Sequence, residues 1–195
     1  MRRSKLLILA VILLSILSFS TTIKMYHVTD YHSHAIPFYS EGQHGFGGIA
    51  RIITYLREKS VDENTLVFCG GDMINLGTPA WSDKFHAIEL PWFNNIFDAM
   101  AFGNHDSEYG AEDFQEVWKQ LTYPILGGNI LDVNGSPVFE CLGKRYLVFE
   151  VEGKRIGVFA LAGSDYDSLV KPAARPLEEP HLEILWGQPP RSSKK

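Results

Sequence analysis

The amino-acid sequence predicts a layered α/β fold. In the first half of the chain, short apolar runs typical of strands alternate with helical segments, and the second half begins an antiparallel section. Leu66 to Cys69 is the clearest strand, and Ile49 to Lys59 is the clearest helix because its apolar residues recur at helical spacing. The runs at residues 146–150 and 155–161 flank a Glu-Gly pair and predict a β-hairpin.

The remaining elements follow in chain order. Strands are expected at residues 22–28, 98–102 and 123–130, and helices at residues 112–121 and, in part, 85–97. The Gly-rich stretch at residues 42–48 predicts only a link into the first helix. Five of the ten prolines lie between Pro172 and Pro190, so residues 172–195 are expected to form an irregular, Pro-rich tail behind a domain at residues 21–171.

The composition is that of a globular protein with one domain. The chain has 195 residues, of which 45% are hydrophobic, which is enough for a single core. The formal net charge is −5 and no basic stripe runs along the chain, so nucleic acid is not expected as a partner. Serine hydrolases and NTPases lack support, because the sequence has no Gly-x-Ser-x-Gly elbow, P-loop or Cys–His nucleophile arrangement.

The first twenty residues have the build of a secretory signal peptide. Three positive residues precede an apolar run from Leu6 to Phe19, and Ser18 and Ser20 supply small residues for a cleavage site. A membrane anchor is the alternative, but a helix of this run would be only ~21 Å long against a hydrocarbon core of ~30 Å. We therefore expect residues 1–20 to be removed and the protein to be exported, to the periplasm or the outside of the cell, with no stable membrane span after cleavage.

The chain has two cysteines, Cys69 and Cys141. An exported protein could join them in a disulfide. Because Cys69 ends an apolar run with the character of a buried strand, a buried free thiol is the favoured interpretation.

Polar side chains of metal-ligand type follow three of the predicted strands. They are Asp30 and His32 after the first strand, Asp72 after the second, and Asn104 and His105 after the third. Ligands gather at the carboxyl ends of the strands in an open α/β sheet, so these side chains are expected to meet in one place. Each cluster alone could be an ordinary turn. Their occurrence at three strand ends favours a shared site.

These clusters lie in motifs that resemble those of the calcineurin-like metallophosphoesterases, in the form used by the 5′-nucleotidase branch. The motifs are His27-Val-Thr-Asp30-Tyr-His32, Gly70-Gly71-Asp72-Met73 with Gly77-Thr78-Pro79, and Asp98-Ala-Met-Ala-Phe-Gly103-Asn104-His105-Asp106-Ser-Glu108-Tyr-Gly110. The segments Gly47-Gly48-Ile-Ala-Arg51 and Gly127-Gly-Asn129-Ile130 are also similar to that branch. The resemblance covers roughly residues 22–170. It implies a layered β-sandwich flanked by helices, with an incomplete second half.

The resemblance also implies a site for two divalent metal ions, such as Mn²⁺ or Zn²⁺. Asp30 and His32 would hold the first ion, and Asp72 would bridge both. Asn104 would hold the second ion and bind the substrate phosphate. A hydroxide held by both ions would attack phosphorus in line. The implied substrates are small phosphate esters, in particular the phosphate monoesters of nucleotides.

His105 is expected to be catalytic under the same resemblance. It would bind the substrate beside the scissile bond and stabilise charge or protonate the leaving oxygen. Glu108 would orient the ring of His105 through a hydrogen bond. The family commonly has Glu at the position of Asp106 and Asp at the position of Glu108. The extra methylene of Glu108 therefore requires a backbone adjustment.

The family completes its metal site with further histidines, and this chain departs from that pattern. After His105 the only histidine is His181, in the expected tail. We therefore expect the chain to hold only the N-terminal part of the catalytic domain. Two alternatives to an active phosphoesterase follow. The chain could be a truncated remnant with little or no activity, or a subunit whose site is completed by histidines of a second chain.

The predicted signal peptide leads to a direct test. Cleavage after Ser20 should give a mature N-terminus near Thr21, because small residues then occupy the two positions that the cleaving enzyme reads. N-terminal sequencing of the expressed protein measures this. An intact Met1 on protein from a cytosolic fraction would contradict the prediction.

Overall fold

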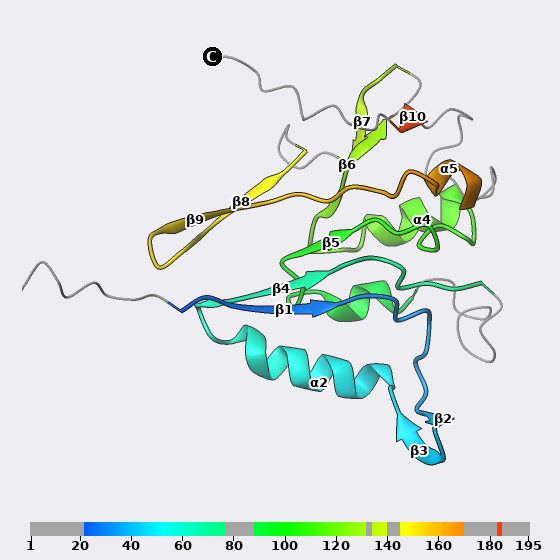
Figure 1. Ribbon diagram of the computed structural model, residues 1–195, viewed down its shortest axis with the longest axis vertical. Helices are drawn as coiled ribbons and strands as arrows, with labels where there is room; N and C mark the ends of the chain where they lie inside the picture. The colour runs from blue at the N-terminus through cyan, green and yellow to red at the C-terminus, as the bar shows by residue number, and fades with distance from the viewer. Residues whose placement is uncertain (1–21, 77–87, 132–133, 140–144, 170–182, 185–195) are drawn as a thin grey trace, which may run out of the picture.

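The computed structural model describes residues 22–76, 88–131, 134–139, 145–169 and 183–184 (Figure 1). The expected signal peptide lies outside these ranges, as do Cys141 and all of the expected tail except Glu183 and Ile184. Within the described ranges, no helix is both long enough and apolar enough to cross a membrane.

A six-stranded sheet forms the centre of the fold. Its parallel strands lie side by side in chain order and are β1 (Lys24–Val28), β4 (Thr65–Cys69), β5 (Ala99–Ala101) and β6 (Ile125–Leu131). The short strands β7 (Pro137–Phe139) and β10 (Glu183–Ile184) pair antiparallel with β6. Because β1, β4 and β5 run in one direction, the loops that follow them leave the sheet at the same edge (Figure 1).

Helices and two antiparallel hairpins flank the sheet. The helical elements are α2 (Ile49–Ser60), the 3₁₀ helix η1 (Leu90–Phe93), α4 (Ala111–Trp118) and α5 (Tyr166–Leu169). The hairpins are β2 (Phe38–Ser40) with β3 (Gln43–Phe46), and β8 (Leu147–Val151) with β9 (Lys154–Val158). At the β8–β9 turn, Glu152 and Gly153 have φ of 49° and 68°, the left-handed conformation that a tight two-residue hairpin turn requires.

The sheet is covered on both faces, as the side-chain alternation along β4 shows. Val67 and Cys69 pack in one core cluster with Leu56 of α2. Phe68 points to the other face, where its ring contacts Phe149 of β8 with centroids 5.8 Å apart. In Figure 1, α2 lies on one side of β1 and β4 and the β8–β9 hairpin lies on the other. The result is a helix layer, a sheet and a hairpin layer.

A second core cluster packs α4 against the far part of the sheet. The ring of Phe102, directly after β5, lies 5.2 Å from that of Phe114 in α4 and 4.7 Å from that of Phe139 in β7. All three side chains are at most 4% exposed. Since Phe102 immediately precedes the loop after β5, this cluster fixes the point at which the chain enters that loop.

The segment after β9 returns to β6 and pairs with it. The backbone N–H of Gly128 donates to the carbonyl of Ala160 at 2.8 Å. The side chain of Asn129 donates to the carbonyl of Ala162 at 3.0 Å and accepts from its N–H at 2.8 Å. The Gly127–Ile130 segment, one of those that resemble the 5′-nucleotidases, therefore joins the two halves of the domain.

The α/β class predicted from the sequence is confirmed, and the structure adds detail to three local expectations. The Gly-rich stretch at residues 42–48 is more than a link, because Gln43–Phe46 forms β3. Residues 85–97 were expected to be helical in part, and in their described portion Leu90–Phe93 forms a 3₁₀ helix with Pro91 in its first turn. In the expected tail, Glu183–Ile184 pairs with β6.

Cys69 is a buried free thiol, as the sequence favoured. Its sulfur accepts a weak hydrogen bond from the N–H of Gly71 at 3.4 Å. Burial raises the pKa of the thiol, so the side chain behaves as a small apolar core residue.

The packing around Phe114 predicts a large loss of stability on truncation. Phe114→Ala should lower the free energy of unfolding by about 3–5 kcal/mol, because the side chain is 2% exposed and leaves a cavity between α4 and the sheet. Urea unfolding followed by tryptophan fluorescence measures this loss. The control is Val61→Ala, whose side chain is 79% exposed and whose removal should cost less than about 0.5 kcal/mol. Equal losses for the two variants would contradict the described core.

Candidate functional site

Three side chains from the loops after β1, β4 and β5 meet at the carboxyl ends of these strands. One ligand atom from each of His32, Asp72 and His105 lies within 4.8 Å of the other two. The rings of His32 and His105 are tilted against each other, with centroids 4.6 Å apart. All three side chains are partly exposed, so solvent and small molecules can reach them.

The backbone of these loops is held in an unusual conformation. Asp30, His32 and Asp72 have φ of 53°, 47° and 54°, in the left-handed region that non-Gly residues rarely adopt. Each such residue costs on the order of 1 kcal/mol and persists only where its surroundings hold it. Here the loop after β1 and the loop after β4 are held together by backbone hydrogen bonds. The N–H of Asp30 donates to the carbonyl of Gly71, and that of His32 to the carbonyl of Asp72, both at 3.1 Å.

Two glycines let the loops after β4 and β5 approach closely. Gly71 has φ of 96°, and a Cβ atom there would lie 2.8 Å from the backbone nitrogen of Gly103. A Cβ atom on Gly103 would collide with the carboxylate of Asp72. Oδ1 of Asp72 accepts the N–H of His105 at 3.1 Å, so the carboxylate is fixed against the loop that carries the histidine.

The buried carboxylate of Asp106 connects the loop after β4 with the loop after β5. Its carboxylate is 2% exposed and accepts backbone N–H groups on both sides. Oδ2 accepts from Asp72 at 3.0 Å and from Gly103 at 2.8 Å. Oδ1 accepts from Met73 at 2.7 Å and from Ile74 at 3.3 Å. Burial raises the pKa of this carboxyl group to about 7, while the hydrogen bonds from Gly103 and Met73 lower it. The sequence did not single out Asp106 for this position.

Glu108 reaches the ring of His105 despite its extra methylene. Its Oε1 lies 2.9 Å from Nδ1 of His105, although Nδ1 does not meet the angular requirement for a hydrogen bond. Oε2 accepts the N–H of Leu76 at 2.7 Å, which ties Glu108 to the loop after β4. Glu108 and His105 are therefore at ion-pair distance. A small rotation of the His105 ring would make the hydrogen bond linear.

The remaining predicted site residues lie beside this group. Oδ1 of Asp30 is 3.6 Å from Nε2 of His32, and Oδ2 accepts the hydroxyl of Thr29 at 2.7 Å. The side chain of Asp30 is 63% exposed. Asn104 is half-buried and precedes His105 in the same loop. The sequence assigned His105 to catalysis and substrate binding, and its ring also lies within reach of the candidate metal ligands His32 and Asp72.

The donor set of His32, Asp72 and His105 fits a divalent metal ion. Imidazole nitrogen and carboxylate oxygen together suit Zn²⁺ and similar ions. Bonds of ~2.0–2.2 Å place two ligands of one ion at most ~4.4 Å apart. The observed spacing of up to 4.8 Å is slightly wider, so a small side-chain movement would close the three ligands around an ion.

The comparison with known families agrees with this geometry. The calcineurin-like phosphoesterase family matches residues 23–194. The chain belongs to this family. The match includes all three loops of the site, so the family resemblance inferred from the motifs is confirmed.

Relatives of this chain include 5′-nucleotidases. The 5′-nucleotidase of Rattus norvegicus is 29% identical over 145 residues, which are 71% of this chain and 25% of the relative. Protein UshA of Yersinia enterocolitica is 27% identical over 156 residues, which are 77% of this chain and 27% of the relative. The chain thus spans about a quarter of the length of these curated relatives.

Solved structures show the same fold. NAD nucleotidase from Haemophilus influenzae matches with a TM-score of 0.61 and 25% identity, over 73% of this chain and 26% of that one. The 5′-nucleotidase precursor from Thermus thermophilus matches with a TM-score of 0.62 and 23% identity, over 75% of this chain and 30% of that one. The phosphoesterase fold expected from the motifs is therefore confirmed.

The four hydrogen bonds to Asp106 predict that an isosteric change will be costly. In Asp106→Asn an amide NH₂ group replaces one oxygen, and two buried N–H groups lose their acceptor. The free energy of unfolding should fall by at least about 2 kcal/mol, as measured by urea unfolding. Asp62→Asn is the control, because that exposed carboxylate pairs with Lys24 at the surface and its loss should change little. A stable Asp106→Asn protein would show that the carboxylate does not hold the loops.

Proposed function

We propose that the chain is an exported, metal-dependent phosphoesterase that hydrolyses phosphate monoesters of nucleotides. The observation that carries this proposal is the convergence of His32, Asp72 and His105 at the carboxyl ends of three parallel strands. Membership of the calcineurin-like phosphoesterase family supports the reaction class.

Of the three converging side chains, His32 and Asp72 would be metal ligands, and His105 would be kept for the substrate. Asp30, His32 and Asp72 would hold one ion, and Asp72 and Asn104 would hold a second. Bound divalent cations would lower the pKa of a coordinated water and neutralise charge on the phosphate oxygens. The chain contributes the fixed positions, because Asp72 is held by the N–H of His105 and its loop is held by Asp106.

His105 and Glu108 would move the proton. Glu108 lies against Nδ1 of His105 and favours a proton on that nitrogen. Nε2 is then available to bind the phosphate or, in the protonated ring, to donate a proton to the leaving oxygen. Such a group has a typical effect of about 10²–10⁴-fold on the rate.

The relatives support the substrate class and the sequence supports export. Relatives in Rattus norvegicus and Mus musculus are 5′-nucleotidases, and a similar structure is an NAD nucleotidase. The common feature of such substrates is a phosphate ester on a nucleoside. Export rests on the charged start and apolar run of residues 1–20.

Phosphate release from AMP tests this function. The purified chain with added Mn²⁺ or Zn²⁺ should release phosphate, and Asp72→Ala should reduce the rate to background because the shared ligand is lost. Turnover in the usual range of ~1–10³ s⁻¹ would show a complete site. Glu63→Ala is a matched control, since Glu63 is an exposed acidic residue outside the site and its removal should leave the rate unchanged.

Two other results are informative. Metal-dependent phosphate release that survives Asp72→Ala would contradict the proposed site. Metal binding without turnover would support the alternative of a metal-binding domain with little activity, and activity gained only with a second polypeptide would support the subunit alternative.

A further inference from the structure

A buried carboxyl group lies behind the loop that carries His32. Glu89, at the start of η1, has an exposed fraction of 0%. Among the residues that the structure describes, neither of its carboxyl oxygens has a hydrogen-bond partner, and the same is true of the buried hydroxyl of Tyr31. Buried polar groups almost always have partners, so such a pair in one place requires an explanation.

Glu89 is buried near the two residues that flank His32. The hydroxyl of Ser33 is close enough to lower the pKa of Glu89, although burial has the larger, opposite effect. The carboxylate in turn helps to raise the pKa of Tyr31, after the larger effect of burial. Tyr31 and Ser33 are 6% and 1% exposed. Glu89, Tyr31 and Ser33 therefore form one buried polar cluster, with His32 between two of its members.

The cluster adjoins a strained part of the backbone. His32 and Ser33 have φ of 47° and 53°, so two consecutive residues are held in the left-handed region. Ser33 is fixed on its other side, where its N–H donates to the carbonyl of Met73 at 2.9 Å and its hydroxyl oxygen accepts the N–H of Asn75 at 3.3 Å.

We propose that Glu89 is a positioning residue for His32, which it holds in place for metal binding through the flanking Ser33 and Tyr31. This inference rests on the proposed function, because it assumes that His32 binds a metal ion. In this role the carboxyl group would accept the Ser33 hydroxyl after a small side-chain rotation. Groups behind a metal ligand fix its orientation, and their loss typically weakens metal affinity by about 10–100-fold.

Cobalt binding tests the role directly. Co²⁺ is titrated into the full-length chain, and the visible absorption of the bound ion gives both affinity and ligand geometry. Glu89→Leu, which keeps the volume but removes the polar group, should weaken binding by about 10–100-fold and change the spectrum. Glu89→Gln should bind Co²⁺ nearly as the unmodified chain does, since the amide can still accept from Ser33.

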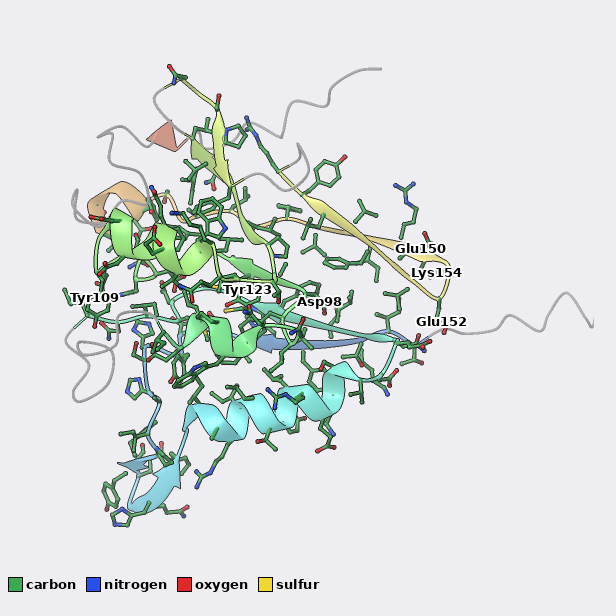
Figure 2. The ribbon with its side chains drawn as sticks, turned by 180° about the vertical axis from the view of Figure 1, so that it is seen from behind. Asp98, Tyr109, Tyr123, Glu150, Glu152 and Lys154 are labelled. Atoms are coloured by element: carbon green, nitrogen blue, oxygen red, sulfur yellow. The ribbon has the colours of Figure 1, made fainter. Side chains whose placement is uncertain are left out.

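Asp98→Ala is the matched control. This half-buried carboxylate accepts the N–H of Val67 at 2.6 Å at the amino end of β5. Figure 2 shows Asp98 well separated from Tyr109, which follows Glu108 at the site. Loss of the Asp98 carboxylate should lower thermal stability and leave Co²⁺ binding unchanged. A folded Glu89→Leu protein that binds Co²⁺ as tightly as the unmodified chain would overturn the inference.

Two further measurements test the role of Glu89 if the first variant does not fold or if the chain does not bind Co²⁺. If Glu89→Leu does not fold, Ser33→Ala must weaken Co²⁺ binding, and unaltered binding would overturn the inference. If the unmodified chain binds no Co²⁺, this result contradicts the proposed function but does not test the role of Glu89. The inference is then decided by the NMR signals of the His32 ring in metal-free protein, which Glu89→Leu must shift and Asp98→Ala must leave in place.

Discussion

The site depends on one buried carboxylate that joins two loops. Asp106 accepts backbone N–H groups from the loop after β4 and from the loop after β5, so neither loop can move without breaking hydrogen bonds in a place that water does not reach. Asp72 and His105 lie on these two loops, and a further hydrogen bond from the N–H of His105 to Oδ1 of Asp72 connects them. The distance between two candidate metal ligands is therefore set by backbone contacts rather than by flexible side chains.

The exchange of the two acidic residues relative to the usual family pattern has a physical basis. A short side chain at position 106 brings its carboxylate close under the backbone, where it meets four N–H groups at once. A longer side chain at position 108 spans the gap between the His105 ring and the N–H of Leu76. Asp106 thus has a structural role, and Glu108 contacts the histidine as well as the loop after β4.

The third loop, after β1, is fixed in a different way. Asp30 and His32 have left-handed backbone conformations, and their N–H groups donate to carbonyls of the loop after β4. The unfavourable conformation is thus offset by hydrogen bonds between loops and by the packing of Tyr31 in the core. Glu89, which directly precedes η1, adds a polar group behind this loop. Residues far apart in sequence therefore determine where His32 points.

The sequence by itself determined the fold class, the order of strands and helices along the chain, and the residues that gather at the carboxyl ends of the strands. Apolar runs such as Leu66 to Cys69 and the helical spacing of Ile49 to Lys59 are local patterns, and parallel strands place the ends of β1, β4 and β5 at one edge. Motif order then identified Asp30, His32, Asp72, Asn104 and His105 as candidates.

Only the tertiary structure decided how these residues are held. The roles of Asp106 and Glu89 depend on burial and on backbone groups from other loops, and such contacts leave no local pattern in the sequence. The same holds for β10 at Glu183–Ile184, where pairing with β6 rather than intrinsic propensity forms the strand.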